Sequence, residues 1–121
     1  MARYKHLPIF QKSYDFLIRL QHYVDRMPRF YRYTHGEKLI NLSLEFLYLI
    51  IQSNSVSNKY PILLKADQEL EKIRIHCRLL HNLKSFTEHQ YEVLSRELDD
   101  IGKQLGGWLK SEIGQEKVLN R

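Results

Sequence analysis

The chain has 121 residues, 43% of them hydrophobic and 27% charged, and its 19 lysines and arginines exceed its 14 acidic residues to give a net charge of +5. This composition excludes a wholly disordered, collagen-like or low-complexity chain, and no apolar run is long enough to span a bilayer. The length predicts a single domain over residues 1–121 whose core needs no disulfide or metal. With one cysteine, Cys77, and no signal-peptide pattern at the start, we expect a cytoplasmic protein.

The first predicted helix runs over about residues 8–27. Pro8 suits a helix start, because its missing N–H would have no intrahelical partner there in any case. Pro28 ends the helix, because it disfavours the helical conformation at the residue before it. The apolar residues form two neighbouring stripes, so the helix is apolar over more than one narrow face. One stripe consists of Phe10, Tyr14, Leu17, Ile18 and Val24, and the other of Phe16, Leu20, Tyr23 and Met27.

The second predicted helix runs over about residues 34–52. Thr34 and Glu37 form a capping box, in which each side chain satisfies a backbone N–H at the start of the helix. A helix with so much apolar surface is predicted to be buried on most sides, either inside a bundle or beneath a second subunit. Its two apolar faces consist of Leu39, Ile40, Ser43, Leu47, Ile50 and Ile51, and of Leu42, Phe46 and Leu49.

The third predicted helix runs over about residues 60–84. Its apolar residues alternate spacings of three and four, which is typical of the seam of a helical bundle. This seam consists of Leu63, Ala66, Leu70, Ile73, Cys77 and Leu80.

The fourth predicted helix runs over about residues 87–111. Thr87 and Gln90 form a second capping box, and Phe86 can pack on Tyr91 as a hydrophobic staple. The three-four spacing recurs at Tyr91, Leu94, Leu98, Ile101, Leu105 and Trp108.

Glycines mark the last part of this helix. Gly102 and Gly106 are four residues apart and share a face, which we interpret as a place where a neighbouring helix approaches closely. Residues 114–121 are expected to be frayed.

No segment shows sustained period-two alternation, so we predict an all-α protein. Short connections between four helices indicate an antiparallel, up-down-up-down four-helix bundle. The apolar excess of the first two helices favours a homo-oligomer, because large exposed apolar patches are rare on monomers.

The sequence lacks the common catalytic and cofactor-binding motifs: it has no phosphate-binding glycine loop, no nucleophile elbow and no paired zinc-binding cysteines. Cys77 and His81 are four residues apart and could lie on one face of the helix, as two metal ligands would. However, Cys77 lies on the apolar seam, where a thiol acts as a small hydrophobic group. Glu97 and Asp99-Asp100 are interpreted as a solvated helix face. We therefore expect no enzyme activity, no metal site and no cofactor.

Basic residues give the strongest indication of function, since residues 1–38 carry eight lysines and arginines against three acids. Arg26, Arg29 and Arg32 surround the first helix–helix turn and are interleaved with the aromatic residues Phe30, Tyr31 and Tyr33. Such a cluster is the electrostatic footprint of a nucleic-acid-binding protein.

A second basic group lies on the third helix, where Arg74, Arg78 and His81 follow an i, i+4, i+7 spacing. Lys65, nearer the start of the same helix, is included in this group because of its charge alone. Arginine grips phosphate bidentately, so these groups, repeated by subunit symmetry, could follow a phosphate backbone. Alternatively, Arg74 and Arg78 pair with acidic residues of their own helix or of a neighbouring subunit.

Several segments resemble the Avd family, the accessory variability determinants of diversity-generating retroelements. The third helix of this family is similar to the segments Leu63-Leu64-Lys65-Ala66-Asp67, Leu70, Ile73-Arg74 and Arg78-Leu79. The fourth helix of the family is similar to the segments Gln90-Tyr91-Glu92, Leu98, Ile101-Gly102 and Leu105-Gly106-Gly107-Trp108-Leu109. Its first helix–helix connection is similar to Met27-Pro28-Arg29 and Thr34-His35-Gly36-Glu37. The resemblance covers about residues 8–111.

The resemblance implies a non-catalytic bundle that assembles as a homopentameric barrel and binds a reverse transcriptase together with RNA or DNA. Such a complex supports mutagenic retrohoming, and Arg74 and Arg78 match the basic pair that the family uses for partner contacts. Four-helix proteins of ribosomal-RNA intervening sequences share the fold and are an alternative. A purely structural, protein-binding oligomer is a further alternative.

Overall fold

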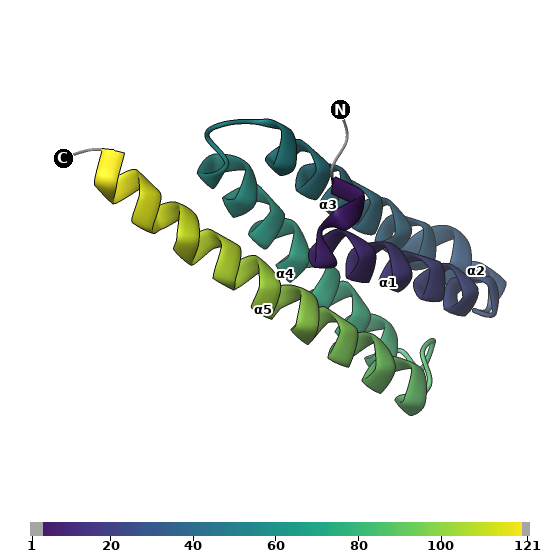
Figure 1. Ribbon diagram of the computed structural model, residues 1–121. Helices are drawn as coiled ribbons and strands as arrows, with labels where there is room; N and C mark the ends of the chain where they lie inside the picture. The colour runs from purple at the N-terminus through teal and green to yellow at the C-terminus, as the bar shows by residue number, and fades with distance from the viewer. Residues whose placement is uncertain (1–3, 120–121) are drawn as a thin grey trace.

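The structure is a computed structural model, which describes the backbone of residues 4–119 and the side chains of residues 4–114. Its four long helices are α1 (Pro8–Asp25), α3 (Glu37–Ser55), α4 (Tyr60–Asn82) and α5 (Glu88–Leu119) (Figure 1). A 3-10 turn, η1 (Tyr4–His6), precedes α1, and the short α2 (Arg29–Tyr31) and the π-helical turn η2 (Arg32–Gly36) lead into α3. No strand occurs over residues 4–119, and the prediction of an all-α protein is confirmed.

Consecutive long helices run antiparallel, as the course of the chain in Figure 1 shows. α1 packs against α3 and α5, and α4 packs against the same two helices. α1 and α4 therefore occupy opposite corners of the bundle. This is the predicted up-down-up-down arrangement.

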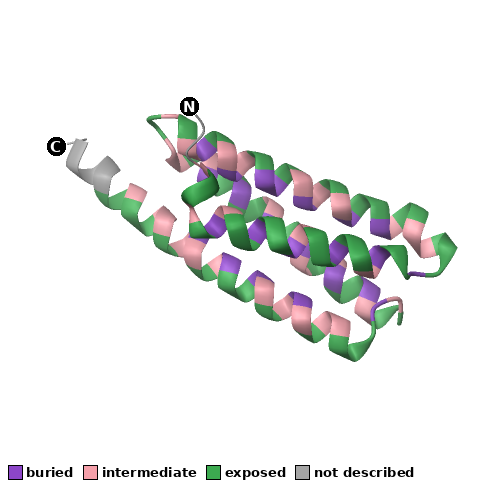
Figure 2. Ribbon diagram, turned by 45° about the vertical axis from the view of Figure 1, so that its right-hand side comes forward, coloured by how far each residue is buried: buried purple, intermediate pink, exposed green. Residues whose placement is uncertain are grey.

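The core is lined by one buried stripe from each long helix, purple in Figure 2. α4 contributes all six residues of the predicted seam, none of them more than 3% exposed. α5 contributes Leu94, Leu98, Ile101 and Leu105, while Tyr91 and Trp108 pack partly buried against the core. A three-four spacing places side chains on one face of a helix, so the pattern alone was enough to predict both seams.

The buried side of α1 differs in part from the prediction. Phe16, Leu20 and Met27 are buried as expected, whereas Tyr14 and Ile18 are 41% and 46% exposed. A step of two residues turns about 200° around a helix axis, so Ile18 lies opposite Phe16 and Leu20. The predicted stripe is therefore wrong at Tyr14 and Ile18.

The segment between α1 and α3 also differs, because helix already begins at Arg29 and the predicted capping box at Thr34 is wrong. The Thr34 hydroxyl instead donates to the Phe30 carbonyl at 2.8 Å, one turn earlier. Gly36 is buried against α1, and a Cβ on it would lie 2.8 Å from Cγ1 of Val24. The helical chain passes this contact through a π-turn, which accommodates one extra residue.

The connection from α3 to α4 is shorter than predicted, because α3 continues to Ser55. The ammonium group of Lys59 donates to the carbonyls of Ser53 at 2.9 Å and Val56 at 2.6 Å. It thereby satisfies carbonyls that the end of a helix leaves without intrahelical partners. Sequence reasoning did not identify this role of Lys59.

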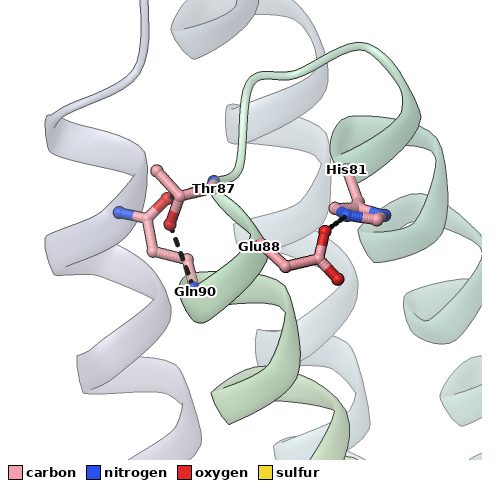
Figure 3. A network of polar contacts seen from close by, with 4 residues as sticks. All are labelled: His81, Thr87, Glu88 and Gln90. Carbon is pink, nitrogen blue, oxygen red and sulfur yellow. Dashed lines mark hydrogen bonds and ion pairs between the residues drawn. The ribbon is translucent and has the colours of Figure 1, made fainter.

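The start of α5 carries the second predicted capping box, which is confirmed (Figure 3). The N–H of Gln90 donates to the Thr87 hydroxyl at 3.1 Å, and the N–H of Thr87 donates to the Gln90 side chain at 3.0 Å. Phe86 is buried at the same turn, with its ring 6.4 Å from that of Tyr23 on α1. These contacts fix the entry of the chain into α5.

α4 ends in a Schellman motif. The N–H groups of Ser85 and Lys84 donate to the carbonyls of Leu80 and His81, each at 2.9 Å. Lys84 has a φ of 61°, in the left-handed region where glycine is usual. A lysine thus occupies the position in this motif at which a side chain is least favoured.

α5 continues to Leu119, beyond the predicted helix end at about residue 111, and its backbone is helical over residues 114–119, where fraying was expected. Residues 120 and 121, the rest of that expectation, lie outside the described residues. The sequence after Gly114 contains glutamine, glutamate, lysine and leucine, which favour helix, and no proline that would stop it. Within residues 4–119 no helix combines the length and apolarity needed to cross a membrane.

Candidate nucleic-acid interface

The predicted binding residues fall into two groups. Arg26 follows α1, and Arg29 and Arg32 belong to α2 and η2, so all three lie at the turn between α1 and α3. We call these three residues the arginine turn. The four remaining residues, Lys65, Arg74, Arg78 and His81, lie on α4.

Arg32 stabilises the arginine turn through a hydrogen bond to the backbone. Arg32 is partly buried, and its Nη2 donates to the carbonyl of Met27 at 3.2 Å, back across Pro28. Arg26 and Arg29 are exposed. The turn therefore holds one arginine as an anchor and presents two to solvent.

Two aromatic rings accompany the arginine turn. Phe30 is 72% exposed and Tyr33 is 61% exposed. The guanidinium carbons of Arg29 and Arg32 each lie 5.9 Å from the centre of the Tyr33 ring, within the range of a cation–π interaction. The interleaving of rings and arginines was visible in the sequence, but the exposure of the rings was not.

Arg74, predicted to bind a partner, is hydrogen-bonded to α5. Its Nη1 donates to the carboxylate of Asp99 at 2.9 Å, and its Nη2 donates to the carbonyl of Leu98 at 3.1 Å. The guanidinium lies over Gly102, where a Cβ would come within 2.5 Å of Nη2. In this structure Arg74 joins α4 to α5.

An open groove of about 570 Å³ surrounds Arg74 between α4 and α5. Asp67, Glu71 and Asp99 line it, against the two cations Arg74 and Lys103. Since its acidic groups outnumber its basic ones, the groove is poorly suited to a polyanion.

Arg78 and Lys65 lie exposed on α4. Arg78 is one turn beyond Arg74, and among the side chains of residues 4–114 it takes part in no ion pair. Lys65 precedes Arg78 by thirteen residues, which is about 20 Å along a helix. The two cations are therefore separate points on α4 and not one cluster.

His81 is engaged within the fold. Its Nε2 lies 2.7 Å from a carboxylate oxygen of Glu88 at the start of α5 (Figure 3). Its ring stacks on that of Tyr91, with the ring centres 4.2 Å apart and the planes 6° from parallel. His81 therefore links the end of α4 to the start of α5.

The carboxylates of α5 serve mostly to join helices. Glu97 pairs with Arg19 and Asp100 pairs with Lys12 of α1, the latter at 3.7 Å. Burial raises the pKa of Glu97, against the opposing effect of Arg19, while Glu97 raises the pKa of Arg19. Together with the pair between Asp99 and Arg74, these contacts give the predicted solvated face of α5 a structural role.

Cys77 is only 1% exposed, and burial raises the pKa of its thiol to about 12. The thiol packs in the hydrophobic core as a small apolar group. Across the side chains that the structure describes, no three His, Cys, Asp or Glu residues are placed to share a metal ion.

These features define a class of protein: a small, basic four-helix bundle with arginines and aromatic rings exposed on its surface. The sequence matches a family model described as bAvd-like over residues 7–112, and the chain belongs to this family. The match is consistent with the Avd protein of diversity-generating retroelements and confirms the resemblance drawn from the sequence. The comparison with curated proteins finds no match.

Proposed function

We propose that the protein is a non-catalytic accessory protein of a diversity-generating retroelement, which binds the reverse transcriptase and its template RNA or cDNA. The observation that carries this proposal is the family match over residues 7–112, nearly the whole chain. We place its action in the cytoplasm, where a single buried thiol such as that of Cys77 stays reduced.

The charge distribution supports a nucleic-acid partner. Five acidic side chains of α5, Glu88, Glu92, Glu97, Asp99 and Asp100, each pair with a basic side chain of the protein. Arg26, Arg29 and Arg78 are exposed, and no ion pair among residues 4–114 includes them. These three arginines are therefore free to meet a partner, as are exposed lysines such as Lys38, Lys65 and Lys84, which are in no such ion pair either.

We further propose that the protein assembles as a homopentameric barrel. Tyr14 and Ile18 form an exposed apolar pair on α1, and Ile75 and Leu79, 59% and 38% exposed, form another on α4. These helices stand at opposite corners of the bundle. Two different patches on opposite sides of a subunit suit a head-to-tail contact, which forms a ring when the rotation between neighbouring subunits closes.

The test of binding uses purified protein, template RNA and the reverse transcriptase. Changing Arg26, Arg29 and Arg78 to alanine together is expected to weaken RNA binding and to make the plot of log affinity against log salt less steep. On a single strand the slope becomes shallower by about 0.7 for each phosphate that the protein no longer neutralises. A matched control removes three positive charges elsewhere, with Lys5, Lys103 and Lys110 changed to alanine.

RNA affinity without salt dependence would favour the alternative of a structural, protein-binding oligomer. Equal weakening in the triple variant and its control would mean that net charge acts without these particular arginines. The proposal would be contradicted if the protein fails to bind RNA, or if it fails to bind the reverse transcriptase.

A further inference from the structure

The two rings of the arginine turn are unusually accessible for aromatic side chains. Phe30, at 72% exposed, is the most exposed large hydrophobic side chain among those the structure describes, and Tyr33, at 61%, is the second. Leaving such rings in water forgoes the stabilisation that their burial would give. The two rings, in a turn held by the hydrogen bond of Arg32, are therefore available to bind a partner.

The backbone holds both rings in place. Phe30 lies on α2 and Tyr33 lies on the π-helical turn η2, three residues further along continuous helical structure. The rings of Phe30 and Tyr31 pack edge to face with their centres 5.4 Å apart, and the carbonyl of Phe30 accepts a hydrogen bond from Thr34. The rings are supported from within the turn while their surfaces remain open to solvent.

The charges around the rings specify a polyanion. Residues 26–36 contain three arginines and no acidic residue. Arg29 and Arg32 flank the Tyr33 ring, so a flat group placed against the rings would lie beside guanidinium groups. Unpaired nucleic-acid bases combine a flat aromatic face with a neighbouring phosphate, and such strands bind proteins through aromatic stacking and basic grooves.

We propose that Phe30 and Tyr33 form a stacking site for unpaired bases, with Arg26 and Arg29 contacting the adjoining phosphates. This inference rests on the proposed nucleic-acid-binding function and makes it specific for single strands. A duplex hides the faces of its bases, so it can engage the arginines but not the rings.

The experiment measures fluorescence anisotropy of three labelled probes of equal length with the full chain. The probes are an oligouridylate strand, an abasic strand with the same backbone, and a duplex. The oligouridylate is expected to bind most tightly. Phe30→Ala and Tyr33→Ala are each expected to weaken its binding by about 5- to 150-fold, the range for loss of one base–ring stack. Binding of the abasic strand and of the duplex is expected to change less than about twofold, because neither depends on stacking.

Matched variants separate stacking from folding. Tyr48, 55% exposed on α3, provides the control Tyr48→Ala, which removes an exposed ring outside the turn. Phe30→Tyr and Tyr33→Phe keep a ring and are expected to retain affinity for the oligouridylate. Thermal melting followed by circular dichroism checks that each variant is folded.

The outcomes also separate this inference from the proposed function. Equal binding of the oligouridylate and the abasic strand would overturn the stacking site and leave the proposed function standing, whereas failure of all three probes to bind would contradict both. If Phe30→Ala weakens binding to the reverse transcriptase but not to any probe, the rings are a protein contact and the inference is wrong.

Discussion

The guanidinium group of Arg74 lies against the backbone of Gly102, close enough that a Cβ there would come within 2.5 Å of Nη2. A glycine on α5 thus gives an arginine on α4 room to reach Asp99 and the Leu98 carbonyl. The close approach of a neighbouring helix predicted at Gly102 is therefore not what the structure shows, because the space is filled by the Arg74 side chain. At Gly106 the prediction is wrong, because no described atom would lie within 4 Å of an added Cβ.

Replacing these glycines with alanine should separate flexible from rigid neighbours. Gly102→Ala is expected to change the free energy of unfolding by less than about 1 kcal/mol, because the gain in helix propensity offsets the displaced surface ion pair. Gly36→Ala is expected to cost about 1–3 kcal/mol, because the buried Val24 side chain, 2.8 Å from the new Cβ, must shift. Urea denaturation measures both. A cost at Gly102 equal to that at Gly36 would show that Arg74 cannot move aside.

The two arginines of α4 should respond differently to truncation. Arg74→Ala is expected to lower the free energy of unfolding by about 0.5–1 kcal/mol, because it removes a partly exposed ion pair and a hydrogen bond to the Leu98 carbonyl. Arg78→Ala, at an exposed position without an ion pair among the described residues, is expected to change it by less than about 0.5 kcal/mol. Chemical denaturation of the two single variants checks this, and equal effects would contradict the assignment of Arg74 as the joint between α4 and α5.

Lys84 offers a route to higher stability. Its φ of 61° is unfavourable for a residue with a Cβ, so Lys84→Gly is expected to raise the free energy of unfolding by about 1 kcal/mol. Lys84→Ala removes the same charge but keeps the Cβ, and it should give no such gain. If both variants behave alike in thermal melting, the charge and not the backbone conformation determines the effect.

His76 makes stability depend on pH. Burial is the main cause that lowers its pKa, Lys38 and His35 add to the effect, and a hydrogen bond with the Lys72 carbonyl opposes it. The folded protein therefore takes up this proton less readily than the unfolded chain, and stability falls as pH drops through the ordinary histidine value of about 6.5. The decrease levels off once the pH lies below the lowered value.

Comparing melting temperatures at pH values above and below about 6.5, the ordinary histidine pKa, tests the role of His76. His76→Gln cannot take up the proton and is expected to lose less stability on acidification than the wild type. His22→Gln, at an exposed position on α1, is the control and should follow the wild type. An unchanged pH dependence in His76→Gln would contradict the prediction.

The fold followed from the sequence wherever a repeating apolar pattern or a local cap determined the structure. All six seam residues of α4 are buried, and the capping box of Thr87 and Gln90 forms as predicted. Thr34 and Glu37 show the same local signature, yet they lie within continuous helical structure. There Gly36 packs against Val24 of α1, and this contact cannot be read from neighbouring residues.

The candidate site was only partly predictable for a related reason. Charge and spacing identified the arginines, but they could not show that Asp99 and Leu98 hold Arg74, because that contact depends on how α4 and α5 align. Nor could they show that Phe30 and Tyr33 stay exposed, since aromatic residues in a helical segment usually pack inward. Sequence spacing finds residues of one helix that can act together, whereas burial depends on the assembled bundle.

The length of α5 has a practical consequence for attaching the protein to a surface. α5 starts beside the turn at Thr87 and ends at Leu119, on the far side of the molecule from the turn that links α1 and α3 (Figure 1). At about 1.5 Å per residue, its 32 residues span about 48 Å. A tag or fluorophore coupled near the end of α5 is therefore remote from Phe30 and Tyr33, so sensor chips prepared in this way leave those rings facing the solution.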